Sequence, residues 1–175
     1  MALEVLREPV NALFGLFFGI GISAYAVYAG MKLFDKLTPH IDEWKELKKG
    51  NVAVALVLSA VVFSIGLLME KPFSLVISIL APGTTLLNFS ISVLVALLIT
   101  LVSLLLSTLL LFISVRLIDS LTTDINEMAE LKKGNVAIAL VLSFCIVAIA
   151  FLTRGALFDV VFSLHLSSLA TIVLN

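Results

Sequence analysis

The stretch ELKKGNVAVALVLS fills residues 46–59, and ELKKGNVAIALVLS fills residues 130–143. Thirteen of the fourteen positions are identical, and the one difference exchanges Val for Ile. Weaker matches at the same spacing of 84 residues extend upstream of both copies. Self-similarity at a fixed spacing is typical of repeated structure. The sequence therefore predicts two tandem repeats, the first in residues 1–84 and the second in residues 85–175.

The composition is that of a membrane protein. Of 175 residues, 61% are hydrophobic and 13% are charged, and the mean hydropathy is +1.21. A soluble domain has about 45–50% apolar and about 25% charged residues. Because the polar residues are too few to cover the surface of a soluble protein of this size, we expect the chain to be surrounded by lipid. The net charge of −1 provides no positive field that would favour nucleic acid.

Each repeat contains two apolar segments of helical length, so the predicted fold is an all-α polytopic protein with about four spans. The first segments cover residues 10–34 and 86–117, and the second cover residues 51–69 and 135–153. A hydrocarbon core of about 30 Å needs about 20 apolar residues. The first stretch is too long, and its leader too acidic, for a cleaved signal peptide, so we interpret it as a retained span.

The apolar residues that follow each second span leave the topology open. Residues 72–82 and 156–174 can be short re-entrant or surface segments, which gives two parallel repeats. A further complete span between residues 73 and 115 would instead give inverted repeats, an arrangement found in transporters. We favour the parallel model.

Basic residues support that choice. Eight of the eleven Lys and Arg residues fall within residues 32–50 and 116–134. Because cytoplasmic loops carry an excess of Lys and Arg, both connections are expected in the cytoplasm, with the Lys71 turn outside.

The first connection reads as an amphipathic helix on the membrane surface, capped by Thr38 and followed by Pro39. Its predicted apolar stripe comprises Leu37, Ile41, Trp44 and Leu47, repeated in the second copy by Ile125, Met128 and Leu131. The Gly-Asn pair after each connection would end the surface helix and cap the next span, since Gly permits the turn and Asn accepts from a free N–H.

These repeated corners are the first candidate site, and they comprise Glu46, Lys49, Gly50, Asn51, Glu130, Lys133, Gly134 and Asn135. One reading is purely structural, with a hinge, a cap and lysines at the lipid headgroups. The other reading makes the acidic and amide groups the mouth of a pore that selects cations.

Small residues mark the faces on which the spans are expected to pack. Small side chains four residues apart let helix backbones approach closely in lipid. The candidates are Gly15, Gly19 and Ser23 in the first span and Ser103 and Ser107 in the corresponding span of the second repeat. A hydroxyl-lined path in an oligomer is the alternative interpretation.

The sequence gives no reason to expect an enzyme, a cofactor or a metal site. No serine stands in a Gly-x-Ser-x-Gly context, and no group of ligands has metal-binding spacing. The single cysteine, Cys145, has no partner for a disulfide and reads as a packing residue.

The unit Glu-x-x-Lys-Gly-Asn-x-Ala at the start of a second span, present twice, resembles the YjfL-like family of uncharacterised bacterial and archaeal membrane proteins. The residues that carry the resemblance are Glu46, Lys49, Gly50, Asn51 and Ala53, and again Glu130, Lys133, Gly134, Asn135 and Ala137. The resemblance implies an inner-membrane, multi-pass protein with tandem two-helix repeats. It implies no activity.

Two functions fit these features. The duplication, the small-residue faces and the polar corners favour a homo-oligomeric channel or transporter for small ions. Four spans in so short a chain enclose little space, so a pore would need several copies. The alternative is a non-transporting scaffold or stress-response component that recruits cytoplasmic partners through residues 35–50 and 119–134.

Overall fold

The computed structural model describes residues 2–39, 41–79, 86–121 and 126–164, without the side chains of residues 2–12, 14, 86–88 and 121. In this described part of the chain every regular element is an α-helix. The four long helices are α1 (Ala2–Leu37), α3 (Val52–Ile79), α4 (Leu86–Leu121) and α6 (Val136–Ser163). The two short helices are α2 (Glu43–Lys48) and α5 (Glu127–Lys132).

The helices follow the period of the sequence. Each helix of the second half begins and ends 84 residues after its counterpart in the first half. Accordingly α1 and α4 have 36 residues each, α2 and α5 have 6, and α3 and α6 have 28.

All four long helices are long and apolar enough to cross a membrane. The candidate spans cover Gly15–Leu37, Val52–Ile79, Phe89–Ser120 and Val136–Ser163. The predicted fold class, an all-α polytopic membrane protein, is confirmed.

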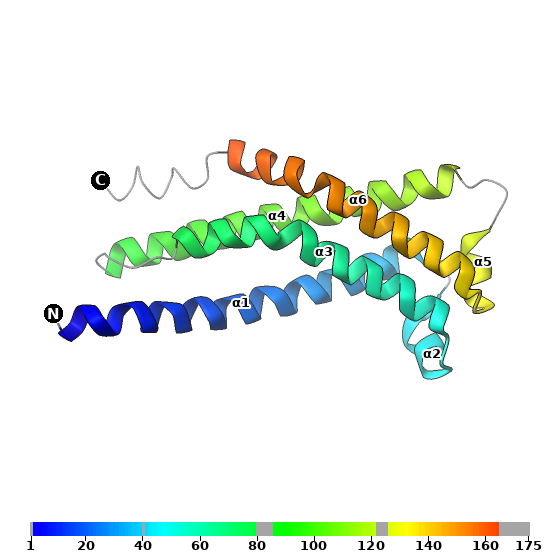
Figure 1. Ribbon diagram of the computed structural model, residues 1–175, viewed down its shortest axis with the longest axis horizontal. Coiled ribbons are helices and arrows are strands. Elements are labelled where there is room, and N and C mark those ends of the chain that lie inside the picture. Colours follow the sequence, from blue (N-terminus) through cyan, green and yellow to red (C-terminus); the bar gives the residue numbers. More distant parts are fainter. Residues whose placement is uncertain (1, 40, 80–85, 122–125, 165–175) are drawn as a thin grey trace.

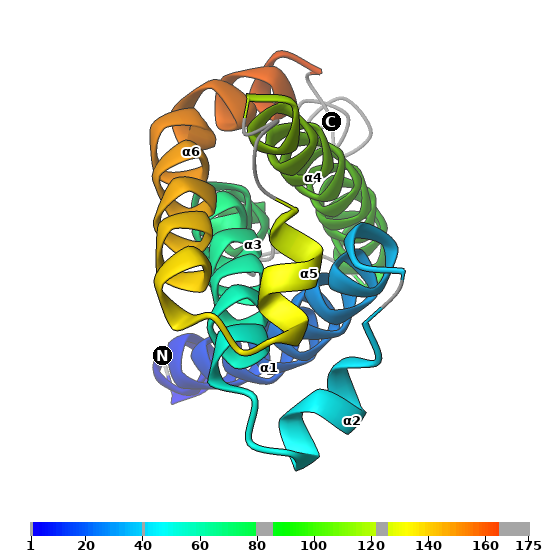
Figure 2. The same cartoon turned by 90° about the vertical axis from the view of Figure 1, so that its right-hand side faces the viewer.

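The long helices run along one common direction, and the two short helices lie at the same end of the bundle (Figure 1). Figure 2 looks at that end and shows α5 in front of the bundle, with α2 projecting from its edge. Inverted repeats would place α2 and α5 at opposite ends, so the observed arrangement is the parallel one.

Helix α3 is the centre of the packing and contacts each of the other three long helices. The largest fully buried side chains are Phe34, Leu33, Ile65, Leu68, Ile99, Leu111, Leu131, Ile146, Val54, Val61, Val76 and Val161. Because lipid tails are as apolar as these side chains, close packing rather than escape from water holds such helices together.

The predicted end of the second spans is wrong. Helix α3 continues through the buried Pro72 to Ile79, and α6 continues through Arg154 to Ser163. Proline removes one backbone donor, but neighbouring helices in a membrane can compensate for the freed carbonyl. Residues 72–79 are therefore part of α3. Residues 80–85 and 165–175, where the two predicted re-entrant segments end, lie outside the described residues.

Candidate functional site

Each short helix ends in the same backbone turn. Gly50 and Gly134 both have a φ of 78°, a left-handed conformation that glycine adopts without steric cost. In the first corner the Asn51 N–H donates to the Glu46 carbonyl at 3.0 Å, and the Gly50 N–H donates to the Leu47 carbonyl at 2.9 Å. The second corner repeats both bonds at 3.0 Å. This pair of bonds is the Schellman motif, so the predicted glycine turns are confirmed.

The side chains of each corner bind one another. The Glu46 carboxylate accepts from Lys49 Nζ at 2.6 Å and from Asn51 Nδ2 at 3.0 Å. The equivalent distances around Glu130 are 2.7 and 2.8 Å. In each corner the pKa of the glutamate is lowered from its ordinary value. The hydrogen bond from the asparagine lowers it most and the hydrogen bond from the lysine next, because both donors favour the charged form.

The same asparagines cap the spans. Asn51 Oδ1 accepts from the Val54 N–H at 3.2 Å, and Asn135 Oδ1 accepts from the Ile138 N–H at 3.4 Å. Each side chain thus satisfies one backbone donor that the first turn of a helix leaves free. The predicted caps are confirmed.

Asn51 also joins the two repeats. Its Nδ2 donates to the Leu131 carbonyl of α5 at 3.0 Å. A methyl group built at Gly134 would lie 3.8 Å from Asn51 Oδ1, so the two corners are in close contact. The polar atoms that the sequence singles out here are engaged in holding the turns and joining the corners. Whether they also line a pore mouth stays a prediction.

The surface helix begins later than predicted. Thr38 does not cap it, because the buried Thr38 hydroxyl donates to the Phe34 carbonyl at the end of α1. The N-cap of α2 is Asp42, whose side chain accepts from the Lys45 N–H at 3.0 Å. Leu37 and Ile41 are buried, Leu47 is half-buried and Trp44 is 55% exposed, so contact of this apolar stripe with the membrane stays a prediction. Ile125 lies outside the described residues.

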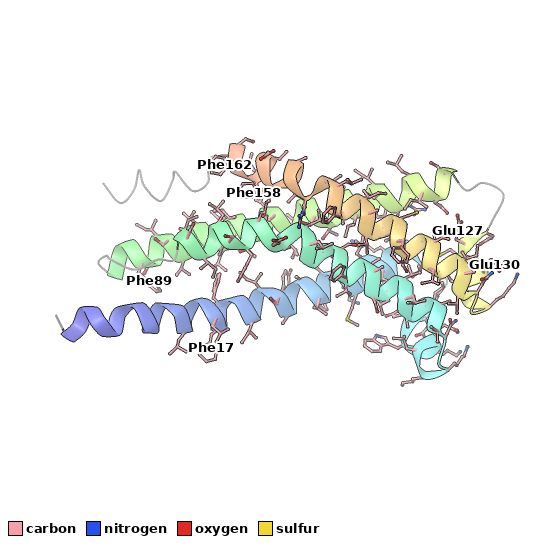
Figure 3. The ribbon with its side chains drawn as sticks, viewed as in Figure 1. Phe17, Phe89, Glu127, Glu130, Phe158 and Phe162 are labelled. Carbon is pink, nitrogen blue, oxygen red and sulfur yellow. The ribbon has the colours of Figure 1, made fainter. Side chains whose placement is uncertain are left out.

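Two carboxyl groups that sequence reasoning did not select are buried at this end. Glu43 and Glu127 open the two short helices at equivalent positions and are 9% and 6% exposed. Figure 3 shows Glu127 with Glu130 on α5. Burial, and then the neighbouring Asp35, raise the pKa of Glu43. Glu127 and Asp119 line a cavity of about 30 Å³ between the repeats.

The two predicted packing glycines of the first span lie where α1 meets its neighbour α3. A methyl group built at Gly19 would lie 2.8 Å from the Phe73 ring, and one at Gly15 would lie 3.5 Å from Ile77. Ser23 is exposed beside them. In α4, Ser103 and Ser107 are fully buried, and no described residue bonds their hydroxyl oxygens.

A second group of polar residues lies far from the corners, inside the long helices. Arg154 Nη1 of α6 lies 2.9 Å from Glu70 Oε2 of α3, and their side chains are 32% and 61% exposed. The Arg154 guanidinium lies 4.4 Å from the centre of the Phe151 ring. The Lys71 ammonium lies 5.5 Å from the centre of the Phe158 ring, which Figure 3 labels on α6.

The neighbours of Glu70 fix its level in the bundle. Glu70 lines a groove of about 210 Å³ together with Ile22 and Ser23 of α1. The nearest charged residues of α1 are Lys32, ten residues after Ile22, and Glu8, fourteen residues before it. At about 1.5 Å per residue these separations are about 15 Å and about 21 Å along the helix axis. Glu70 therefore lies beside the middle of the uncharged part of α1.

Sequence reasoning missed this pair because it interpreted Lys71 as part of a turn outside the membrane. The structure places Lys71 within α3, eight residues before its end. One signal was present: Glu70 and Arg154 occupy equivalent positions in the two repeats and carry opposite charges. Opposite charges at equivalent positions can meet only if the two second spans pack side by side.

Within the described residues, no group of three or more His, Cys, Asp or Glu side chains could hold a metal ion. A family model described as Domain of Unknown Function (DUF350) matches residues 9–157 and, in a second match, residues 91–175. No curated protein and no solved structure matches the chain. The first family match spans most of the chain, although it does not test the expected YjfL-like name. The chain therefore belongs to the family described as Domain of Unknown Function (DUF350).

Proposed function

We propose that this integral membrane protein assembles into a homo-oligomer that moves small ions across the bilayer, as a channel or transporter. The observation that carries the proposal is the exposed ion pair between Glu70 and Arg154 at the level of the middle of α1. Glu70 lies inside the candidate span Val52–Ile79, eighteen residues after its start and nine before its end, so the pair is expected within the bilayer.

Charges at that depth need a polar environment. A single charged side chain at the centre of a membrane helix costs about 2.5–3.5 kcal/mol on insertion scales. Such residues almost always face other protein or a water-filled cavity, and they mark pathways for ions or substrates. The Glu70 side chain is 61% exposed on a single chain, so lipid would surround it unless water or a second copy lies there.

The interior of one chain offers little room for a path. The cavity between the repeats measures about 30 Å³, against roughly 10–15 Å³ needed to hold one water, so it has room for a few waters at most. Larger hollows are open grooves on the outside of the bundle, such as the one beside Glu70. A pathway that includes Glu70 is therefore expected between copies of the chain.

The distribution of basic residues supports one orientation of the assembly. With eight of eleven Lys and Arg residues in or just before the two connections, within residues 32–50 and 116–134, the positive-inside rule favours corners that face the cytoplasm of an inner-membrane protein. Reporter fusions in α2 and α5 should then give the same cytoplasmic readout.

The test is ion flux in liposomes together with the mass of the particle. Purified protein is reconstituted, and the fluxes of K⁺, Na⁺, H⁺ and Cl⁻ are followed under imposed gradients. We expect flux of at least one ion above protein-free liposomes and a particle mass of several chains. A monomeric particle, or no flux of any ion under any gradient, would overturn the proposal.

A further inference from the structure

We infer that Glu70 is a contact site for small monovalent cations, on a wall formed by the exposed face of α3. The inference rests on the proposed function and names its substrate class. Three features carry it: the surroundings of the basic groups, the free carboxylate oxygen and the composition of the α3 face.

The two basic side chains at this level, Arg154 and Lys71, lie over aromatic rings. Arg154 lies over the Phe151 ring and also bonds Glu70, and Lys71 lies over the Phe158 ring. The face of an aromatic ring carries partial negative charge and attracts such cations. These ring contacts hold the two basic groups against α6, although they leave the positive charges in place.

The carboxylate is the more exposed partner of the pair. Glu70 is 61% exposed against 32% for Arg154. Arg154 bonds only Oε2, and within the described part of the chain Oε1 has no hydrogen-bond partner. In an assembly of several copies each chain would contribute one such oxygen, and rings of acidic side chains are how cation channels select their ions.

The exposed face of α3 differs from that of a lipid-facing helix. Between residues 59 and 78 its exposed residues are Ser59, Phe63, Gly66, Glu70, Lys71, Ser74 and Ser78. Helix α4 provides the comparison, because between residues 91 and 115 its exposed residues are all Leu or Ile: Leu94, Leu97, Leu98, Leu101, Leu105, Leu109 and Ile113. The exposed face of α4 is therefore suited to contact with lipid tails, whereas the exposed face of α3 is suited to contact with water and ions.

The chemistry of the site favours a monovalent ion. Tight divalent sites usually combine several carboxylate or carbonyl oxygens. The described residues contain no group of three acidic, histidine or cysteine side chains that could hold a metal ion. Each chain offers one carboxylate at this level, and that carboxylate also binds Arg154. Such a group is expected to bind an ion weakly, so that the ion can dissociate again.

The first experiment measures the K⁺ to Cl⁻ permeability ratio in bilayers under a KCl gradient. We expect the wild type to prefer K⁺, Glu70→Gln to lose that preference several-fold, and the charge-conserving Glu70→Asp to keep it. Asp159→Asn serves as the matched control, since Asp159 is an exposed carboxylate on α6, whose exposed neighbours Val160 and Phe162 are apolar. An unchanged ratio in Glu70→Gln, with the particle intact, would overturn the inference.

A second measurement separates this inference from the proposed function. The melting temperature of the purified protein is compared in KCl and in choline chloride of equal ionic strength, because an ion that binds the folded state raises it. We expect K⁺ to stabilise the wild type more than Glu70→Gln. If the wild type conducts no ion but shows this difference, the cation site stands and transport fails. Equal responses of both proteins would overturn the cation site.

Discussion

Glu70 and Arg154 occupy the same position in the two halves of the chain, 84 residues apart, and form an ion pair with each other at 2.9 Å. Helices α3 and α6, which carry the two residues, pack against each other. The first half carries a carboxylate at this position and the second half carries a guanidinium, so the two halves differ in charge where they meet.

Exchanging the two charges tests this contact. Glu70→Arg should lower the stability of the purified protein, because two cations then face each other across α3 and α6. The double variant with Arg154→Glu should recover it. We expect an effect of roughly 1 kcal/mol for a partly exposed pair, or about 2–4 °C in melting temperature. A double variant no more stable than the single one would show that the pair does not act as a unit.

The corner turns predict a ranking of substitutions at Gly50, whose φ is 78°. Asn tolerates left-handed backbone, whereas a β-branched residue does not. Gly50→Val should therefore destabilise the protein by about 1–2 kcal/mol, and Gly50→Asn by clearly less. No atom lies within 4 Å of a methyl group built there, so crowding is not the cause. Equal melting temperatures for the two variants would contradict the role assigned to the turn.

Glu46 should stabilise the fold at neutral pH. Its pKa is lowered in the folded state by Asn51 and Lys49, so its contribution is present above the unfolded pKa of about 4.3 and is lost as the pH falls through the folded pKa. Glu46→Gln should therefore melt below the wild type at pH 7, and the difference should shrink on acidification. A difference that does not depend on pH would point to lost packing instead.

Glu43 should show the opposite dependence. Burial raises its pKa in the folded state, so its contribution to stability is complete below the unfolded pKa of about 4.3 and is lost as the pH rises through the folded pKa. Glu43→Gln, which keeps the shape and cannot ionise, should melt above the wild type at pH 7. The melting curves of the two proteins should converge at acidic pH. A variant that is less stable at pH 7 would contradict the assignment.

The sequence was sufficient for the parts of the fold that depend on local chemistry. Apolar length predicts the four spans, and the Gly-Asn pair predicts the turn and cap of each corner, because one residue supplies the left-handed backbone and the next supplies the acceptor. The self-similarity predicts the period that the helices follow. None of these needs knowledge of a distant partner.

The wrong prediction for the end of the second spans depended on distant partners. The sequence predicts Lys71 in a turn after the second span, since a charged residue usually marks a boundary of an apolar segment. In the structure Glu70 bonds a residue 84 positions away, and Pro72 is buried within the bundle. The start of α2 failed for a local reason, because Thr38 bonds back to Phe34 and extends the end of α1.

The exposed face of α3 is proposed to meet water inside the membrane. The most direct test is thiol labelling of single-cysteine variants in native membranes, in a Cys145→Ser background, with a water-soluble reagent. Ser59→Cys and Ser74→Cys on α3 should be labelled, whereas Leu101→Cys and Leu105→Cys on the lipid-facing side of α4 should not. Protection of the α3 positions equal to that of the α4 positions would contradict the claim.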